Sequence, residues 1–390
     1  MKPPSNRMEQ SAPSFFSELA IKIEAMRQAG YDVIRLDEGS PDLPPAPPII
    51  AALINSASSS NTHSYQTHRG PKDLRIAWTE MYHRVHNVSL DPDSEVLPLL
   101  GSKEGIFHLS LAYLDPGDVA LIPDPGYITY NRGATFAGGR PYFMPLLPEK
   151  AYLPDLDAIP ADVLHKAKLV WLNYPSNPTA SVAPLEFFEK AVAFARKNDL
   201  LLCHDAAYSQ VTYDGYHAAS ILEVPEAKEV AVEFNSLSKT YNMAGWRLGA
   251  LVGNPQVVRT LFTLKTNADS SHFMPILQAA TEAMTGDQGW IKERNQVYQQ
   301  RRDLVIHTLH GLGLMAAIPR ASLYVWCPVP GELTCEDFTN LVLDQAHISL
   351  TPGTVFGDHG EGYVRISLTA PTERLTLAMQ RISSLSFVKK

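Results

Sequence analysis

The sequence is poor in cysteine and in clustered positive charge, and each shortage argues against a class of protein. Only three of its 390 residues are cysteines, and Cys203, Cys327 and Cys335 form no CxxC or CxxxC pair. This spacing argues against a disulfide scaffold and suits a reducing cytoplasm. The net charge of −8, without a run of lysine and arginine, argues against a nucleic-acid partner.

Long apolar stretches are also missing. No uninterrupted apolar run is long enough to cross a bilayer, and residues 1–10 lack the apolar region of a signal peptide. We therefore expect a cytoplasmic protein that has no membrane partner.

Several catalytic signatures are absent as well. The thirteen histidines include no HExxH, and neither a GxSxG nor a P-loop pattern occurs. His83 and His86 lie three residues apart on a predicted helix without a matching acid, so a surface pair is favoured over a metal site. We expect no metal.

The chain does contain the pattern of an α/β protein. Its length favours two domains, or one large domain with a smaller lobe. Short apolar runs alternate with helical patterns such as 103–114 and 185–197, which is typical of a parallel sheet covered by helices. The predicted strands are 96–100, 119–122, 141–144, 169–172, 200–204, 230–235 and 250–252.

The two ends of the chain predict a second lobe. A Pro-rich segment at 41–48 is expected to be a hinge that leads into the main domain. The elements predicted outside the main domain are helices at about 14–29, at about 288–309 and from about 372, with strands at 322–327 and 362–368. The expected domains are a large domain at 45–290 and a small domain formed by 1–44 and 291–390.

Three of the predicted strands run directly into polar turns that are rich in proline, glycine or asparagine. These turns are 123–127, 173–178 and 205–208. Ligands of an open α/β sheet bind beyond the carboxyl ends of its strands, so we expect the three turns to converge on one crevice.

The most informative segment is Asn235-Ser236-Leu237-Ser238-Lys239-Thr240, followed by Gly245-Trp246-Arg247-Leu248-Gly249. A lysine amine attacks an aldehyde only after it loses its proton, and a desolvated, positively charged site lowers its pKa in that way. A phosphorylated aldehyde such as pyridoxal phosphate would supply a carbonyl for Lys239 and an anion for Ser236, Ser238 and Arg247. A solvated loop lysine is the alternative, since most lysines are exposed.

An acid in a neighbouring turn supports the cofactor. Asp205 ends a predicted strand, where its carboxylate could pair with a protonated pyridine nitrogen and keep the ring an electron sink. Tyr208 and Asn177 could then bind the phenolic oxygen of the ring. The alternative makes Asp205 the N-cap of a helix.

Three further positions favour the same chemistry, though each is weak evidence alone. Gly101-Ser102-Lys103-Glu104-Gly105 joins a strand to a helix, and the N–H groups of such a helix start could cradle a phosphate. Tyr127 could stack on the ring or simply pack. Strand alternation separates Arg365 from its apolar neighbours, so it is either a carboxylate clamp or an exposed edge-strand arginine.

Read together, these residues resemble a known family. Asn177-Pro178-Thr179, Asp205-x-x-Tyr208, the lysine segment with Gly245-x-Arg247-x-Gly249, and Arg365 are similar to motifs of the class I/II aminotransferases. These enzymes form part of the aspartate aminotransferase superfamily, use pyridoxal phosphate and have fold type I. The likeness spans nearly the whole chain. The segments most similar to LL-diaminopimelate aminotransferases are 96–105, 123–130, 172–179 and 356–368.

The resemblance implies a fold and a set of roles. The fold would be a large domain with a mostly parallel seven-stranded sheet between helices, joined to a smaller α+β domain. Lys239 would form an aldimine with the cofactor and shuttle a proton, Asp205 would pair with the pyridinium, and Tyr208 and Asn177 would bind the phenolic oxygen. The other implied contacts are Ser102, Lys103, Glu104, Ser236, Ser238 and Arg247 with the phosphate, Tyr127 with the ring, Arg365, Asn177 and Gly39 with the substrate, and Tyr65 with the cofactor of a second subunit.

The expected activity is transfer of an amino group from an L-amino acid to a 2-oxo acid, foremost 2-oxoglutarate, in a ping-pong reaction of a homodimer with shared active sites. Diaminopimelate, alanine, glutamate, aspartate and aromatic donors all stay open. A β-lyase with the same cofactor and a cofactor-binding regulatory domain are the alternatives, and no DNA-binding motif precedes Ser14 to support the second. One residue departs from the family pattern: Ala180 stands where glycine is usual, and it would be strained if its φ were positive.

Overall fold

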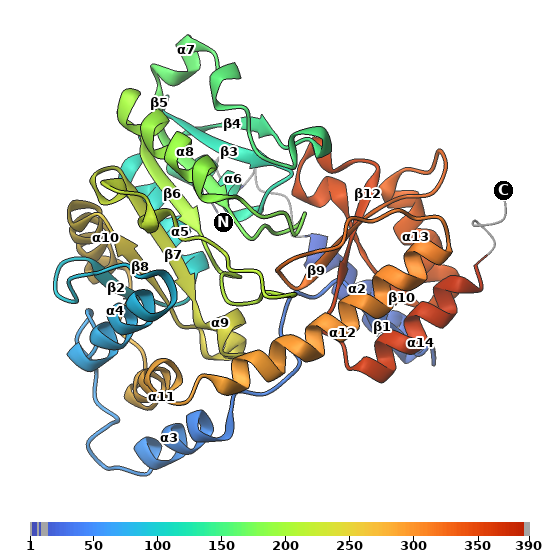
Figure 1. Cartoon of the computed structure of the whole chain (residues 1–390), viewed down its shortest axis with the longest axis horizontal. Helices are drawn as coiled ribbons and strands as arrows, with labels where there is room; N and C mark the ends of the chain where they lie inside the picture. The colour runs from blue at the N-terminus through green and yellow to red at the C-terminus, as the bar shows by residue number, and fades with distance from the viewer. Residues whose placement is uncertain (1, 6–7, 9–14, 386–390) are drawn as a thin grey trace.

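The computed structural model describes residues 2–5, 8 and 15–385, and a seven-stranded sheet between two layers of helices dominates it (Figure 1). The strands of this sheet are β2 (Val96–Leu99), β3 (Val119–Asp124), β4 (Arg140–Pro145), β5 (Ala167–Asn173), β6 (Leu201–Asp205), β7 (Ala231–Ser236) and β8 (Gly249–Gly253). Their spatial order is β2-β8-β7-β6-β5-β3-β4. All neighbouring pairs are parallel except the two made by β8, which is antiparallel to β2 and to β7.

Strand β5 explains why both faces of the sheet are covered. Its side chains alternate, so that Leu169 and Trp171 belong to one core and Val170 and Leu172 to another, and all four are at most 1% exposed. The first core contains side chains of α5 (Ser102–Tyr113), α6 (Thr129–Ala137) and α10 (Pro255–Ala268). The second contains side chains of α3 (Pro47–Ala57), α4 (Lys72–His86), α8 (Leu185–Lys197) and α11 (Met274–Thr285). Strands buried on both faces are typically nearly continuous apolar runs, as residues 169–172 are.

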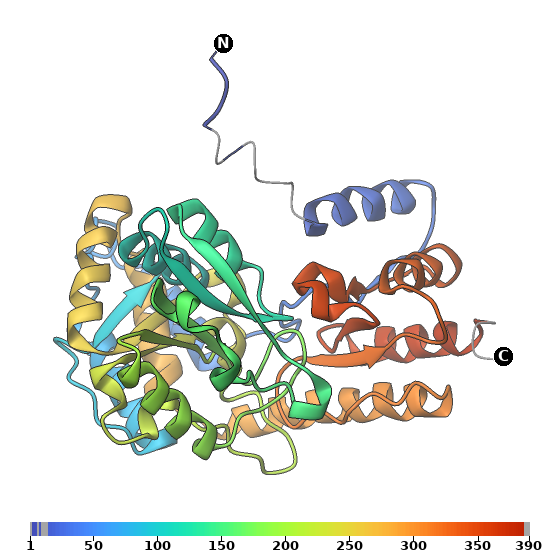
Figure 2. The ribbon, with the colours of Figure 1, turned by 90° about the horizontal axis from the view of Figure 1, so that it is seen from above.

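A second group of elements lies beside the large sheet (Figure 2). Strands β11 (Thr351–Pro352), β12 (Tyr363–Ser367) and β9 (Tyr324–Pro328) form an antiparallel sheet, and β1 (Ile34–Arg35) pairs with β10 (Ile348–Ser349). Its helices are α2 (Phe15–Gln28), α12 (Gly289–Gly311), α13 (Cys335–Ala346) and α14 (Thr372–Ser383). The long helix α12 runs from the first group to the second (Figure 1). The second group has its own core, to which α12, α13 and α14 contribute.

The predicted α/β class with a mostly parallel sheet is confirmed, and each predicted strand of the large sheet lies within about two residues of an observed one. One prediction is wrong in part. Pro47 and Pro48 do not belong to a hinge but open helix α3, where the missing N–H of proline leaves no hydrogen bond unmade. Within residues 15–385, no helix combines the length and the apolar character needed to cross a membrane.

Candidate active site

The three polar turns do converge, on a cavity of about 800 Å³ at the carboxyl ends of the central strands. The last residues of β5, β6 and β7, which are Asn173, Asp205 and Ser236, all line it. The cavity is closed on its other side by residues of the second group, among them Tyr324 and Arg365. The predicted site residues that line it are Gly39, Ser102, Lys103, Tyr127, Asn177, Asp205, Tyr208, Ser236, Ser238, Lys239, Arg247 and Arg365.

Lys239 lies on a single helical turn, α9 (Leu237–Thr240), that begins directly after β7. Ser236 caps this turn by accepting a hydrogen bond from the backbone N–H of Ser238 at 3.3 Å. The Lys239 ammonium donates to the carbonyl oxygen of Gly39. Burial, helped by the charges of Arg365 and Arg247, lowers the pKa of Lys239 to about 8. The lysine is therefore not a solvated loop residue, and its amine is within reach of deprotonation near neutral pH.

Asp205 is a buried acid with one free oxygen. Its side chain is 4% exposed, Oδ2 accepts a hydrogen bond from the Tyr130 hydroxyl at 2.7 Å, and Oδ1 has no partner among the residues that the structure describes. Burial raises the pKa of Asp205 to about 6, although the bond from Tyr130 works against that rise. The alternative role as a helix N-cap is wrong, since turns and not a helix follow β6. The carboxylate is instead aimed into the cavity with an oxygen to spare.

The side chain of Asn173 ties the ends of two strands together. It donates from Nδ2 to the carbonyl of Asp205 at 2.7 Å, and its Oδ1 accepts the backbone N–H of Asn177 at 2.8 Å. Asn177 in turn accepts a hydrogen bond from Arg365 at 2.8 Å. One chain of hydrogen bonds therefore positions the acid, the amide and the arginine relative to one another.

Tyr208 reaches the cavity from the turn after β6. Its hydroxyl forms a hydrogen bond of 2.9 Å with the hydroxyl of Tyr324, and the two rings meet edge to face. Burial and the neighbouring Tyr324 hold the pKa of Tyr208 well above its usual value. The Tyr208 hydroxyl therefore keeps its proton, and it can donate to an acceptor in the cavity when Tyr324 donates the hydrogen bond between the two hydroxyls.

Arg365 is a buried cation, and its hydrogen-bond partners among the described residues are all uncharged groups. Its guanidinium donates to Asn177 Oδ1, to the carbonyl of Asp37 at 2.6 Å and to the Thr351 hydroxyl at 3.3 Å, and it lies 4.3 Å from the centre of the Tyr324 ring. Its Nε has no partner among the described residues. The edge-strand alternative is wrong, because β12 is the middle strand of its sheet and Arg365 is 3% exposed. A buried positive charge of this kind favours the binding of an anion in the cavity.

An anion cradle lies across the cavity, at the start of α5. The first N–H groups of a helix have no partner within it, and Ser102 and Lys103, the first two residues of α5, both line the cavity. Gly101 has a φ of 82°, and a Cβ there would lie 2.5 Å from the Arg247 guanidinium, so glycine is what lets this arginine approach. The pKa of Lys103 is lowered by burial and by the nearby charges of Arg132 and Arg247.

Two predicted residues lie outside the cavity lining. The Glu104 carboxylate turns away and accepts from the backbone N–H of Leu100 at 3.1 Å, so only its backbone N–H stays a candidate for an anion. Tyr65 is 94% exposed in the loop between α3 and α4 and contacts no part of the cavity of its own chain.

Sequence reasoning missed three residues that shape the site: Tyr130, Asn173 and Tyr324. The position of Asn173 at the end of β5 carried a signal, because it lies within one of the three polar turns. Tyr130 follows Tyr127 by one helical turn, which was a weaker signal. The position of Tyr324 gave none, because it depends on how the second group packs against the first.

The structure also tests the predictions for the histidine pair His83 and His86 and for the backbone of Ala180. The surface pair at His83 and His86 is wrong, because His86 is 6% exposed and its Nδ1 lies 2.9 Å from Glu223 Oε1, while only His83 is exposed. Ala180 has a φ of 55°, which is the backbone conformation that strains an alanine.

Comparisons with known proteins agree with this geometry. The family model described as aminotransferase class I and II matches residues 31–382. The chain belongs to the class I and II aminotransferases.

Among named relatives of this aminotransferase, the LL-diaminopimelate aminotransferase of Moorella thermoacetica is 47% identical over 97% of both chains. That of Syntrophobacter fumaroxidans is 46% identical over 98% of this chain and 99% of its own. The substrate-bound structure of BacF from Bacillus subtilis superimposes with a TM-score of 0.95 at 35% identity and covers 98% of each chain.

Enzymes of this family depend on pyridoxal phosphate, and so does this aminotransferase. The cavity fits that cofactor on three counts. The free Oδ1 of Asp205 suits a pyridinium N–H, the start of α5 with Arg247 suits a phosphate, and the lowered pKa of Lys239 suits an amine that attacks an aldehyde.

Proposed function

We propose that this aminotransferase moves an amino group from LL-diaminopimelate to 2-oxoglutarate in a ping-pong reaction. The observation that carries the transfer chemistry is that Lys239, Asp205 and Arg365 line one cavity. Asp205 Oδ1 and Arg365 Nε have no hydrogen-bond partner among the described residues. The names of the relatives at 47% and 46% identity support the donor.

Bound pyridoxal phosphate would supply an electron sink for the α-carbon of the amino acid and a carrier for its nitrogen. Asp205 would hold the ring nitrogen, while Tyr208 and Asn177 would donate to the phenolic oxygen. The N–H groups of Lys103 and Glu104 and the side chains of Ser102, Ser236, Ser238 and Arg247 would hold the phosphate, and Tyr127 would stack on the ring.

The protein's own proton transfer would fall to Lys239. Its Nζ, with a pKa of about 8, is basic enough to take the proton from the α-carbon of the substrate and to return it elsewhere. Arg365, with Asn177 and the Gly39 backbone, would clamp the substrate α-carboxylate and so present the α-proton to that amine.

Charged groups in the cavity lining support a zwitterionic side chain. Arg35, Asp37 and Glu38 all line the cavity, and the Glu38 side chain is 50% exposed. Arg35 forms an ion pair of 2.7 Å with Asp37 and one of 2.6 Å with Glu38. The distal carboxylate and ammonium of diaminopimelate carry the two charges that complement these groups. A donor with an apolar side chain, such as alanine, offers neither.

We also propose a cytoplasmic homodimer that shares its active sites, with a large domain at 45–290 and a small domain made of 1–44 and 291–390. The exposed ring of Tyr65 supports the dimer, because a tyrosine exposed to 94% is free to enter a partner's cavity.

A donor panel tests the proposal. The purified enzyme is mixed with 2-oxoglutarate and, in turn, with LL-diaminopimelate, alanine, aspartate, glutamate and phenylalanine, and the 2-oxo product or glutamate is measured. We expect LL-diaminopimelate to give the highest kcat/KM, and Lys239→Ala to abolish both the reaction and the visible absorption of the bound cofactor. A better donor than LL-diaminopimelate would refute the substrate alone, whereas ammonia and pyruvate formed without an acceptor would refute amino transfer.

A further inference from the structure

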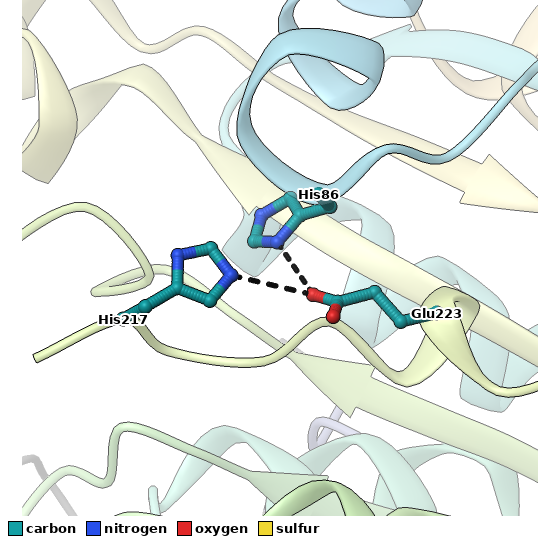
Figure 3. Close-up of side chains that lie close together, drawn as sticks. All are labelled: His86, His217 and Glu223. Atoms are coloured by element: carbon teal, nitrogen blue, oxygen red, sulfur yellow. Dashed lines mark hydrogen bonds and ion pairs between the residues drawn. The ribbon is translucent and has the colours of Figure 1, made fainter.

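A cluster of potential metal ligands lies outside the active site (Figure 3). It consists of His86, the last residue of α4, His217, from the loop after Tyr216, and Glu223, the last residue of the short helix η3 (Ile221–Glu223). Glu223 Oε1 lies 2.9 Å from His86 Nδ1 and 3.6 Å from His217 Nε2. One ligand atom from each of the three residues lies within 4.8 Å of the other two.

We propose that His86, His217 and Glu223 bind a divalent transition-metal cation of the zinc type, with water completing its coordination. Two imidazole nitrogens and one carboxylate oxygen are a donor set that zinc takes with a fourth, open position. Calcium and magnesium prefer oxygen ligands alone, so the two histidines disfavour them.

The spacing of the three ligand atoms suits such an ion. Zinc bonds of about 2.0–2.2 Å in a tetrahedron require ligand atoms a little over 3 Å apart, and the present separations bracket that value. The His217 side chain is 56% exposed on a loop, so it is free to close the remaining gap. The metal would replace the hydrogen bond of 2.9 Å that now joins His86 and Glu223.

The other two ligands are held in place by the protein. Glu223 belongs to a capping box, in which its Oε1 accepts the backbone N–H of Ser220 at 2.8 Å. His86 is 6% exposed at the end of α4, and its ring packs 5.6 Å from that of Tyr82. Two fixed ligands and one mobile ligand make a site that an ion can enter from solvent.

A second cluster of the same residue types shows what such a group does without a metal. Glu104, His108 and Asp269 also bring three ligand atoms together, but the ammonium of Lys265 lies 2.7 Å from Asp269 and 3.7 Å from Glu104. A lysine already supplies the cation there. The ion pairs and hydrogen bonds of Glu223 involve no lysine or arginine among the described residues.

The consequence would be a clamp between distant parts of the chain. A metal would tie the end of α4 to the loop that runs from the active-site turn at Tyr208 to η3. Because none of the three ligands lines the active-site cavity, the metal would stabilise the fold without taking part in amino transfer.

Zinc titration of the cofactor-loaded enzyme, freed of metal by a chelator, tests the site. We expect calorimetry to show one tight zinc ion per chain, zinc to raise the melting temperature, and cobalt to give a visible spectrum of mixed nitrogen and oxygen ligands. His217→Gln should weaken binding about tenfold or more and leave amino transfer unchanged. His83→Gln is the matched control, since His83 is exposed on the same helix and should change nothing.

Glu223→Gln guards against a folding artefact, because glutamine can keep the capping box but loses the anionic ligand. It should fold and bind zinc at least tenfold more weakly. Zinc binding that is equal in the wild type, His217→Gln and Glu223→Gln would overturn the site, and so would a wild type that binds no zinc. Neither result would bear on the aminotransferase activity.

Discussion

Asp205 and Glu233 are two buried carboxylates on neighbouring strands, and the protein treats them in opposite ways. Glu233 on β7 is 0% exposed, and its oxygens accept hydrogen bonds from Tyr82 at 2.7 Å, from His204 at 2.8 Å, and from Ser220 Oγ and the Ile221 N–H at 2.7 and 3.1 Å. Asp205 on β6 has one side-chain partner, Tyr130, and one oxygen with none among the described residues.

The pKa values follow the donors and not the burial. Desolvation raises both, but the bond and the charge of His204 outweigh it at Glu233 and lower that pKa to about 2, whereas burial wins at Asp205 and raises its pKa to about 6. The two ring nitrogens of His204 lie 2.8 Å from Glu233 Oε2 and 2.9 Å from the carbonyl oxygen of Tyr174, so the ring is held between these two groups. Glu233 therefore has a hydrogen-bond donor on each of its oxygens, while Asp205 Oδ1 has no partner among the residues that the structure describes.

The largest expected effect comes from Asp205→Asn. The amide can still accept the Tyr130 hydrogen bond but cannot hold a proton on the cofactor nitrogen, so kcat should fall about 1000-fold, equivalent to about 4 kcal/mol. Steady-state kinetics measure the loss, and the control is an unchanged melting temperature of the cofactor-free protein at pH 4, where the Asp205 carboxyl is protonated. A kcat within tenfold of the wild type would contradict the role of Asp205 in the reaction.

Glu233→Gln should act on stability instead. It removes a buried carboxylate that accepts hydrogen bonds from Tyr82, His204 and Ser220, so the free energy of unfolding should fall by about 3 kcal/mol. Urea denaturation measures this change. The folded variant should keep kcat within tenfold, and a stable but inactive Glu233→Gln would mean that both acids serve the reaction.

The two acids should also give opposite dependences of stability on pH. Folded Asp205 without cofactor has a raised pKa, so its contribution is largest below about pH 4 and is lost as the pH rises through about 6. Glu233 has a lowered pKa, so its contribution is present above about pH 4.5 and is lost as the pH falls toward 2. Between pH 4 and 7 the cofactor-free wild type should lose about 2 kcal/mol relative to Asp205→Asn in urea denaturation. Parallel curves for the two proteins would contradict the raised pKa.

The smallest effect within the comparison is expected from Tyr130→Phe. The phenylalanine keeps the stacking on Trp171, now 5.0 Å between ring centres, but removes the hydrogen bond that Asp205 Oδ2 accepts from the Tyr130 hydroxyl. We expect a loss of about 1 kcal/mol, or about fivefold in kcat, together with a further rise in the pKa of Asp205. The pH dependence of kcat checks the second part, and an unshifted profile would show that Tyr130 only packs.

Local patterns were sufficient for the large sheet and for most of the cavity lining. Apolar runs placed the seven strands, and the rule that ligands bind at strand ends brought Tyr127, Asn177 and Asp205 to one place. The resemblance to a family supplied the role of Gly39, which no local pattern indicated.

Contacts between distant segments could not be predicted in this way. Tyr324 and Tyr208 are 116 residues apart in the sequence, and His86 and Glu223 are 137 apart, so no local sequence pattern indicates that the members of either pair are in contact. The surface assignment of His86 was wrong for this reason, because its acid partner arrives from another part of the fold. Helix α3 was missed because prolines at a helix start resemble prolines in a linker.

The left-handed backbone at Ala180 has a consequence for thermal tolerance. Ala180 is 5% exposed and follows the turn that carries Asn177. Its methyl group raises the free energy of the folded chain, and Ala180 is not among the residues that line the cavity. A single reversion, Ala180→Gly, should therefore raise the unfolding free energy by about 0.5–1 kcal/mol and leave turnover unchanged, which differential scanning calorimetry and kinetics would show together. The methyl group of Ala180 thus lowers the thermal stability of the enzyme close to its active site, and removing it should restore that stability.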